Sequence, residues 1–549
     1  MLIDRRELLL LLPALAAAAC GRGKGGATSG AALPTPGADG LVDGDARHLF
    51  RHIDASPRTL DPILVTEVPA QRIIDDLFEG LVRVAPDGSL SPGVARHWET
   101  LEGGRLLRFE LRDDARWSNG DPVTAGDFLY AWRRLVDPAT ASQSSQWVAA
   151  IEGALDIATG KAEPATLGVR VVDDHTLEVR LLQPTPWFLY LLTNTFLMPL
   201  HRATVETHGD RWTRPENLVC NGAFTLASFR INGSIVLDAN PAYWDAASVA
   251  LRRVTYVPLE DRNAVISRYL AGDIQVADTF AVEEIEWLRE RIGTQARLAP
   301  YFGTVMFAFD VRRPPFDSLP LREALLMALD REIITEKLLR GLFLPAYGVV
   351  PPLDGYEPDL PAWTRLPREE RHALAQQRYA AAGYGPGRPL RAALVVATSG
   401  PDMRRLFEAM SAMWRVALGA EITVEPEEFK VLQQNRELRK LRLFWHAWIG
   451  DYPDPLTFLD LPRRSSPQNF GGFDDARYED LLDAAVATVD ERQRLLLYAQ
   501  AERVLIEQAA LLPVYFYQSR HLLSPALRGW QDNPMDRHLS RDLSLVAPT

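Results

Sequence analysis

The chain has 549 residues, of which 47% are apolar and 24% are charged, and its formal net charge at pH 7 is −12. This composition is typical of a globular protein and excludes a disordered, collagen-like or disulfide-framework chain. A negative balance argues against a protein that grips nucleic acid. At about 150 residues per domain, the length predicts more than one domain.

The first residues predict export. Arg5 and Arg6 precede an apolar run at 8–19 that is too short to cross a bilayer, which takes about 20 residues. The small residues before Cys20 resemble the lipobox of bacterial lipoproteins, in which that cysteine is acylated. We therefore expect a lipoprotein signal peptide at 1–19 and a location in the periplasm or cell envelope, anchored through Cys20. The arginine pair also resembles a twin-arginine signal, so the export route stays open between that pathway and Sec.

Residues 20–45 are rich in glycine, alanine, threonine and proline, which predicts a flexible tether. The one other cysteine is Cys220. With Cys20 acylated it has no partner, so we expect no intrachain disulfide.

Apolar spacing predicts helices and strands that alternate along the rest of the chain. In chain order, we expect a helix over 71–81, a strand at 107–111, a helix that starts at Thr124 with Asp127 as its capping-box acid, a strand at 177–181, and long helices over 321–339 and in the 478–508 region. An aromatic strand at 514–517 follows Pro513. Because the elements alternate without a steady βαβ rhythm, the pattern favours several α/β lobes.

Motifs for enzyme chemistry are missing from the sequence. It contains no G-x-S-x-G elbow, phosphate-binding loop or H-E-x-x-H pattern, and its ten histidines are scattered. Asp451 and Asp454 have the look of a glycosidase pair, but Pro453 and Pro455 make the segment extended. We therefore expect a protein that is not an enzyme, with no cofactor and no metal site.

An aromatic run at 444–452 carries a single acid, Asp451, and no lysine or arginine occurs between Arg442 and Arg463. An acid among aromatic rings is costly unless a cation or hydrogen bonds stabilise it. From the spacing, that cation is either an arginine of the protein or the amine of a ligand.

Many separated segments resemble one family, the oligopeptide-binding (OppA-like) extracellular solute-binding proteins, family 5, of ABC importers. The resemblance covers the chain from about Leu49 to its end. The segments that carry it are 56–62, 76–81, 90–95, 117–125, 127–128, 134–138, 221–224, 240–245, 322–324, 328–331 and 448–452.

The resemblance implies an α/β fold of the periplasmic-binding-protein type II-like class (cluster C), with two lobes, a hinge and an extra domain. The lobes close around the ligand by hinge motion. We expect lobe I at 46–78, 203–302 and 519–549, the extra domain (domain II) at 79–202, and lobe II (domain III) at 303–518.

The resemblance also implies the ligand site. Asp451 falls where the family pairs an aspartate with the free α-amino group of a peptide, which favours the ligand amine over an internal arginine. Ala447, Trp448 and Ile449 fall on one peptide-pairing strand, and the segment opposite is Thr66, Glu67 and Val68. Other family positions near the ligand are Tyr517, Asn469 and Phe429, where Phe429 replaces a tryptophan.

Some family positions differ here. Trp445 replaces a carboxylate-binding arginine of the family, and Ser144 and Met306 replace two tyrosines. Asp278 and Thr279 replace two other polar ligand contacts. Gly303 and Ile449 replace two cysteines. The amino-end anchor is thus retained while the carboxylate end and the pockets differ. We expect a different preference for peptide length and side chains.

The expected function is capture of oligopeptides for an ABC permease by a lipid-anchored monomer, with no nucleic-acid partner. Two alternatives stay open. One is a receptor for another amine-bearing solute such as a murein peptide, an opine or a metal chelate. The other is an exported hydrolase that uses Asp451 and Asp454.

Overall fold

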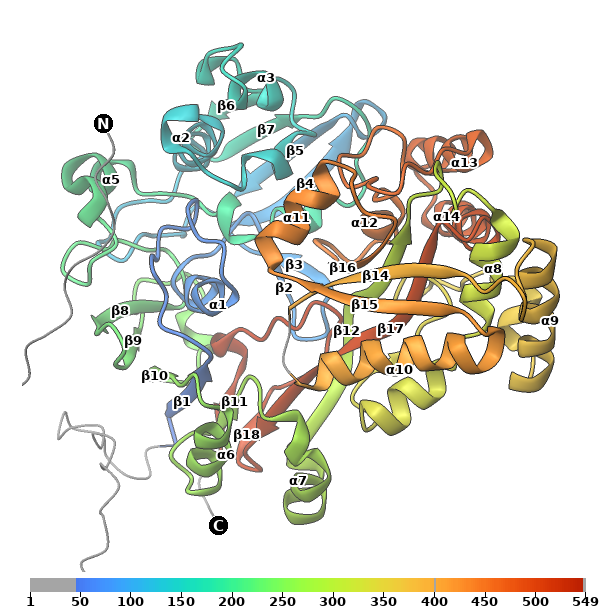
Figure 1. The fold of residues 1–549 in the computed structure, drawn as a ribbon. Helices are drawn as coiled ribbons and strands as arrows, with labels where there is room; N and C mark the ends of the chain where they lie inside the picture. The colour runs from blue at the N-terminus through green and yellow to red at the C-terminus, as the bar shows by residue number, and fades with distance from the viewer. Residues whose placement is uncertain (1–45, 399–400, 547–549) are drawn as a thin grey trace, which may run out of the picture. The chain divides into compact units, whose positions relative to one another are not determined.

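The structure is a computed structural model that describes residues 46–398 and 401–546 (Figure 1). The expected signal peptide, Cys20 and the tether lie outside these residues. The main sheet has 11 strands in the order β15-β14-β16-β12-β17-β11-β1-β10-β9-β8, with β13 beside β17. Its strands are β1 (His48–Ile53), β8 (Phe224–Phe229), β9 (Ile235–Ala239), β10 (Arg253–Pro258), β11 (Val276–Ala277), β12 (Ala296–Phe309), β13 (Leu344–Pro345), β14 (Arg391–Ala397), β15 (Glu421–Glu427), β16 (Leu443–Ile449) and β17 (Leu511–Leu523).

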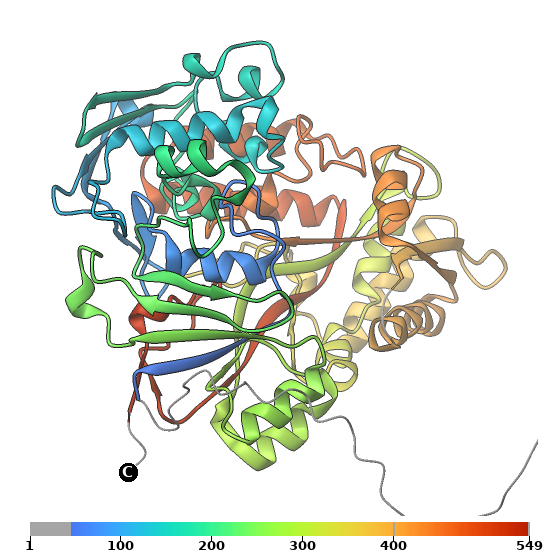
Figure 2. The same ribbon diagram turned by 90° about the vertical axis from the view of Figure 1, so that its left-hand side faces the viewer.

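Two long antiparallel strands, β12 and β17, occupy the middle of this sheet and lie side by side in Figures 1 and 2. Strands β11, β1, β10, β9 and β8 continue the sheet on one side, and β16, β14 and β15 continue it on the other. The β12–β17 ladder is interrupted between Pro300 and Thr304. An irregularity of this kind bends a strand locally.

A second sheet, in the order β4-β5-β7-β6, belongs to residues 79–202. Its expected strands at 107–111 and 177–181 are confirmed as β5 and β7. The helix expected from Thr124 is confirmed as α2 (Ala125–Val136), whose capping box with Asp127 is present. The strands outside the main sheet are β2 (Val82–Val84), β3 (Leu90–Pro92), β4 (Ala95–Leu101), β5 (Leu106–Leu111), β6 (Val169–Asp173), β7 (Thr176–Arg180), β18 (Leu527–Arg528) and β19 (Ser544–Leu545).

Buried apolar side chains form separate cores. One core joins α1 and β8–β10 to the second sheet and α2. Two others contain side chains from residues 302–515, on α8–α14 and the β14–β16 side of the main sheet. The remaining helices are α1 (Val68–Leu77), α3 (Ala154–Ala158), α4 (Phe188–Leu191), α5 (Arg202–His208), α6 (Arg262–Leu270), α7 (Ile285–Ile292), α8 (Leu319–Met327), α9 (Arg368–Ala381), α10 (Pro401–Leu418), α11 (Phe429–Glu437), α12 (Leu456–Leu459), α13 (Ala476–Ala487) and α14 (Glu491–Glu507).

The single helix expected over 321–339 is wrong. Helix α8 ends at Met327, and a short π-helical segment follows at Ile333–Leu338. Between them Arg331 turns inward and donates to the backbone oxygens of Ala346 and Pro513. The neighbouring Asp330 is also buried and accepts from Arg371. Because a buried ionic group needs such partners, the chain leaves the helix to reach them.

The other helix boundaries also differ from expectation. The helix expected over 71–81 begins at Val68, because Pro69 suits a first turn, and it ends at Leu77. The 478–508 region holds two helices, since Asp490 accepts from the backbone N–H of Gln493 and starts α14. Pro513 lies inside β17 rather than before it.

No helix in the described part of the chain combines the length and the apolar character needed to span a bilayer.

Candidate functional site

Strand β16 carries four of the expected ligand-site residues, Trp445, Ala447, Trp448 and Ile449. On one edge β16 pairs with β12 along its length, with Gly303 opposite Ile449. On its other edge, its pairing with β14 within the described residues is Val395 opposite Phe444. The backbone of the following residues is therefore open on that edge, and Ile449 is 47% exposed. An open edge of this kind accepts an extended guest strand.

Asp451 lies just beyond the end of β16. It accepts one side-chain hydrogen bond, from the hydroxyl of Thr457 to Oδ2 at 3.3 Å. No arginine, lysine or histidine among the residues that the structure covers forms an ion pair with it. Burial raises the pKa of this carboxyl group to about 7. The sequence left two partners open for this acid, an arginine of the protein or the amine of a ligand. The described residues provide no such arginine.

Gly450 explains how the acid is fixed to the strand. Its N–H donates to the oxygen of Phe302 at 2.7 Å. A Cβ at this position would lie 2.4 Å from the ring of Phe302, so the contact requires glycine. This contact sets the direction in which the chain turns from β16 into the Asp451 loop.

Two pairs of aromatic rings connect this segment to the second sheet's domain. The ring centroids of Trp448 and Trp147 are 6.5 Å apart, and those of Tyr452 and Trp187 are 5.6 Å apart and stacked. The acid is thus flanked in sequence by two rings that each contact residues of 79–202. Such rings exclude water and present a π face to a cation.

A third aromatic pair, Phe429 and Trp445, lies at the start of α11 and on β16. Their ring centroids are 6.3 Å apart. On α11, Arg436 donates to Nδ1 of His446 at 3.2 Å and lies over the ring of Phe470, and it has no ion pair in the described residues. Burial and this guanidinium lower the pKa of His446 to about 3, so the imidazole is neutral and accepts the bond.

The segment Thr66, Glu67 and Val68, expected opposite residues 447–449, lies at the start of α1. Thr66 and Glu67 lie in irregular backbone, and Val68 is the first residue of α1. Pro69 favours the first turn of a helix, and Glu67 retains an extended backbone before it. The carboxylate of Glu67 accepts from the N–H of Arg58 and the N–H of Thr66. No second strand faces β16 from this segment in the residues described.

The remaining expected residues are held in different ways. Asn469 is buried, and its side-chain amide bonds both the N–H and the oxygen of Phe473. Tyr517 contacts Phe343 and Tyr515, and burial raises its pKa to about 12. Thr279 is buried beside Asp278, which is already bound to arginines.

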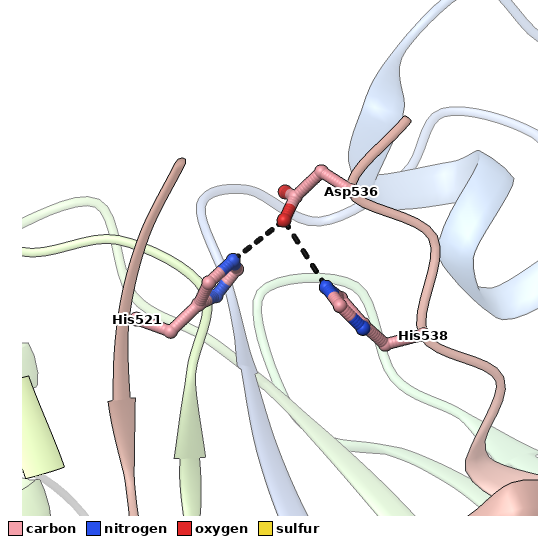
Figure 3. A group of neighbouring side chains, drawn as sticks. All are labelled: His521, Asp536 and His538. Atoms are coloured by element: carbon pink, nitrogen blue, oxygen red, sulfur yellow. Dashed lines mark hydrogen bonds and ion pairs between the residues drawn. The ribbon is translucent and has the colours of Figure 1, made fainter. Parts of the chain in front are cut away.

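Figure 3 shows the one group of metal-type ligands found in the described residues, His521, Asp536 and His538. Both imidazoles bond the same oxygen of Asp536, at 2.7 and 3.1 Å. The other oxygen of Asp536 accepts from Arg72 at 3.2 Å. Asp536 raises the pKa of His521 to about 9, so His521 is itself a cation at neutral pH. A cation beside an arginine disfavours a metal ion, and we interpret the group as an internal ion-pair network.

The sequence analysis missed Thr457, Trp147 and Arg436. Thr457 is six residues after Asp451 and no motif marks it. Trp147 lies in the short helical turn that begins after Ser144, the position at which the family tyrosine is absent. Its place three residues after Ser144 could have identified it as an aromatic residue near the site. Arg436 is visible only in three dimensions, because a buried arginine without an acid has no sequence pattern.

Comparison with solved structures defines the class of the protein. The structure titled "MppA Periplasmic Murein Tripeptide Binding Protein, Unliganded Open Form" matches with a TM-score of 0.84 and 36% identity, over 92% of this chain and 99% of that one. The expected two-lobed α/β fold of periplasmic binding proteins is confirmed.

The sequence comparisons give the family. The model of "Bacterial extracellular solute-binding proteins, family 5 Middle" matches residues 89–470. The periplasmic murein peptide-binding protein MppA of Escherichia coli is 37% identical over 92% of this chain and 95% of its own length. The periplasmic oligopeptide-binding protein OppA of the same organism is 34% identical over 92% of this chain and 94% of its own. The chain belongs to the extracellular solute-binding proteins, family 5.

Proposed function

We propose that the protein captures oligopeptides with a free α-amino group and delivers them to the permease of an ABC importer. The observation that carries this proposal is Asp451, a partly buried carboxylate that has one side-chain hydrogen bond and no counter-ion in the described chain. A peptide ammonium group supplies the missing charge. The names of the relatives, a murein peptide-binding and an oligopeptide-binding protein, support the same ligand class.

The open edge of β16 then holds the peptide backbone. Hydrogen bonds from residues 447–449 need no particular ligand side chain, so one edge serves many sequences. Trp448 and Ile449 flank the first ligand residues, while Phe429 and Trp445 wall a pocket further along. The remaining residues of the site in this proposal are Thr66, Glu67, Val68, Thr279, Asn469 and Tyr517.

The lobes close on the ligand at the interrupted ladder between Pro300 and Thr304. This break coincides with the boundary expected between lobe I at 46–78, 203–302 and 519–549 and lobe II at 303–518, and the extra domain at 79–202 travels with lobe I. The shared core of lobe I and the extra domain supports that division. We also propose that the protein acts as a monomer, anchored through lipid on Cys20.

The proposal is tested by calorimetric titration with trialanine, N-acetyl-trialanine and trialanine amide. Trialanine binds and its N-acetyl form does not, because acetylation removes the ammonium group. Trp445 provides no positive charge for a carboxylate, so the amide binds within a few-fold of the free acid. Equal binding of the acetylated and free peptides contradicts the amine site.

A second candidate is a murein peptide receptor, which the 37% identity to MppA favours. Competition between trialanine and a murein tripeptide ranks the two ligands. An opine or metal-chelate receptor predicts binding of those solutes instead. A hydrolase role has weaker support, since Asp454 faces Arg494 at 3.6 Å rather than a shared substrate position, and cleavage of a peptide pool tests it.

A further inference from the structure

A single hydroxyl group, that of Thr457 on α12, connects the acid to the strand. It accepts a hydrogen bond from the indole N–H of Trp448 at 3.1 Å and another from the backbone N–H of Asp451 at 3.2 Å. A hydroxyl oxygen has two lone pairs and one hydrogen. With both lone pairs engaged, its hydrogen is left for the Asp451 carboxylate, whose Oδ2 is 3.3 Å away.

The packing of Thr457 fixes this orientation. Its side chain is buried at 4% exposure, and its methyl group lies against Gly450. The preceding turn is held by Asp454, which accepts from the N–H of Leu456 at 3.0 Å. The hydroxyl therefore cannot turn to solvent without breaking three bonds.

The charged and titratable groups around the loop do not perform the same task. Tyr452 stacks on Trp187, and Asp454 faces Arg494 of α14. The extra domain presents the uncharged rings of Trp147 and Trp187 to this segment. Asp460, at the end of α12, is near Arg463. Within the described residues, Thr457 is the one side chain that donates to Asp451.

We propose that Thr457 is a positioning residue, which favours the ionised form of the Asp451 carboxyl group, aims it at an incoming ammonium group and links it to Trp448. This inference rests on the proposed amine site and adds the group that prepares it. A donor directed at the carboxylate stabilises its charged form and opposes the effect of burial. The bond from Trp448 makes the ligand-facing ring and the acid one unit.

The decisive measurement is the titration of the Asp451 carboxyl carbon by NMR in unliganded protein with labelled aspartate, assigned by its loss in Asp451→Asn. We expect a midpoint near 7 in the native protein. Thr457→Val keeps the shape but removes the hydroxyl, and the midpoint rises by about one pH unit, as expected for a bond to a charged group. Thr457→Ser restores the native midpoint. Thr423→Val, an exposed threonine on β15, is the matched control and leaves it unchanged.

The same variants are then titrated with trialanine at pH 7.5. Thr457→Val binds about fivefold to tenfold more weakly, and Thr457→Ser binds within about twofold of the native protein. An unchanged carboxyl midpoint in Thr457→Val overturns the inference, even if binding falls. Failure of the proposed function has another signature, because Asp451→Asn then binds trialanine as well as the native protein does.

Discussion

Asp278 and Asp451 are both shielded aspartates, yet their surroundings are opposite. Asp278 is 2.8 Å from Arg72 and 3.1 Å from Arg51, and His521 lies 3.6 Å away. These cations hold the pKa of Asp278 well below its usual range. Asp451 has a hydroxyl donor and no cation in the described chain, and burial raises its pKa to about 7.

The contrast distinguishes an acid whose charge stabilises the fold, Asp278, from an acid whose charge is available to a ligand, Asp451. The network joins Asp278, the residue after β11, to β1, α1 and β17, so its ions are satisfied by the fold itself. Asp451 is left with a charge that the fold does not balance. A buried group that stays costly in the unliganded protein gains stabilisation when a ligand cation arrives.

The largest effect is expected from removing the charge of Asp278. Asp278→Asn leaves the buried Arg51 without its acid and leaves Arg72 and the protonated His521 with Asp536 alone, so the free energy of unfolding falls by about 3–5 kcal/mol. Denaturant unfolding at pH 7 measures it. The control is Asp273→Asn, an exposed acid near Arg268, with an expected change under about 0.5 kcal/mol. Equal effects for the two variants would contradict the claim that the charge of Asp278 stabilises the fold.

Asp451→Asn has the reverse consequence for binding. The free energy of trialanine binding weakens by about 2–5 kcal/mol, because the ammonium group loses its charged partner. Titration calorimetry at pH 7.5 measures the loss. N-acetyl-trialanine, which has no ammonium group, is the control and binds neither the native protein nor the variant. A native-like affinity for trialanine in the variant would contradict the claim that the charge of Asp451 is available to a ligand.

The two acids also predict opposite pH dependences of stability. The folded pKa of Asp451, about 7, lies above its ordinary value of 3.8, so this group favours folding at low pH and that contribution is lost as pH rises to 7. Asp451→Asn in unliganded protein is therefore more stable than the native chain, by up to about 4 kcal/mol above pH 7 and by nothing near pH 4.

For Asp278 the sign is reversed, because its folded pKa is depressed. Its contribution is present above pH 3.8 and is lost as pH falls further, so the cost of Asp278→Asn is constant from pH 5 to about 6. At higher pH the cost shrinks, because His521, whose pKa is about 9, loses the proton that Asp278 helps to stabilise. Unfolding curves of both variants across pH 4–9 test this pair of slopes. Parallel slopes would mean that the two acids do not differ in kind.

The smallest effect is expected at the rings. Trp147→Ala removes the contact with Trp448 and weakens trialanine binding by about 1 kcal/mol, without a change in the pH dependence of affinity. Trp287→Ala, at an exposed tryptophan of α7, is the control and leaves affinity unchanged. A shift of the pH dependence in Trp147→Ala would mean that the extra domain also influences the pKa of Asp451.

Much of the fold follows from local patterns. The capping box at Thr124 and the alternation at 107–111 and 177–181 give elements that tertiary contacts do not alter. The break after Met327 follows from long-range contacts of Asp330 and Arg331, which no local period contains. A buried salt network thus overrides an amphipathic repeat.

The site divides in the same way. Asp451 and the strand at 447–449 stand out in sequence, because one acid inside an aromatic run is unusual and the family motif includes it. The place of Thr66–Val68 opposite that strand rests on the resemblance alone, and Pro69 makes Val68 the first residue of α1. Thr457 escapes sequence reasoning because its role depends on two bonds to separate residues.

The unpaired edge of β16 has a consequence for the protein when it is empty. Exposed strand edges are templates on which other chains add, and the unpaired part of this one, after Phe444, carries Trp445, Ala447, Trp448 and Ile449. A bound peptide covers that edge. We therefore expect the bound peptide to protect this edge from other chains. Unliganded protein at high concentration is then the form most prone to self-association.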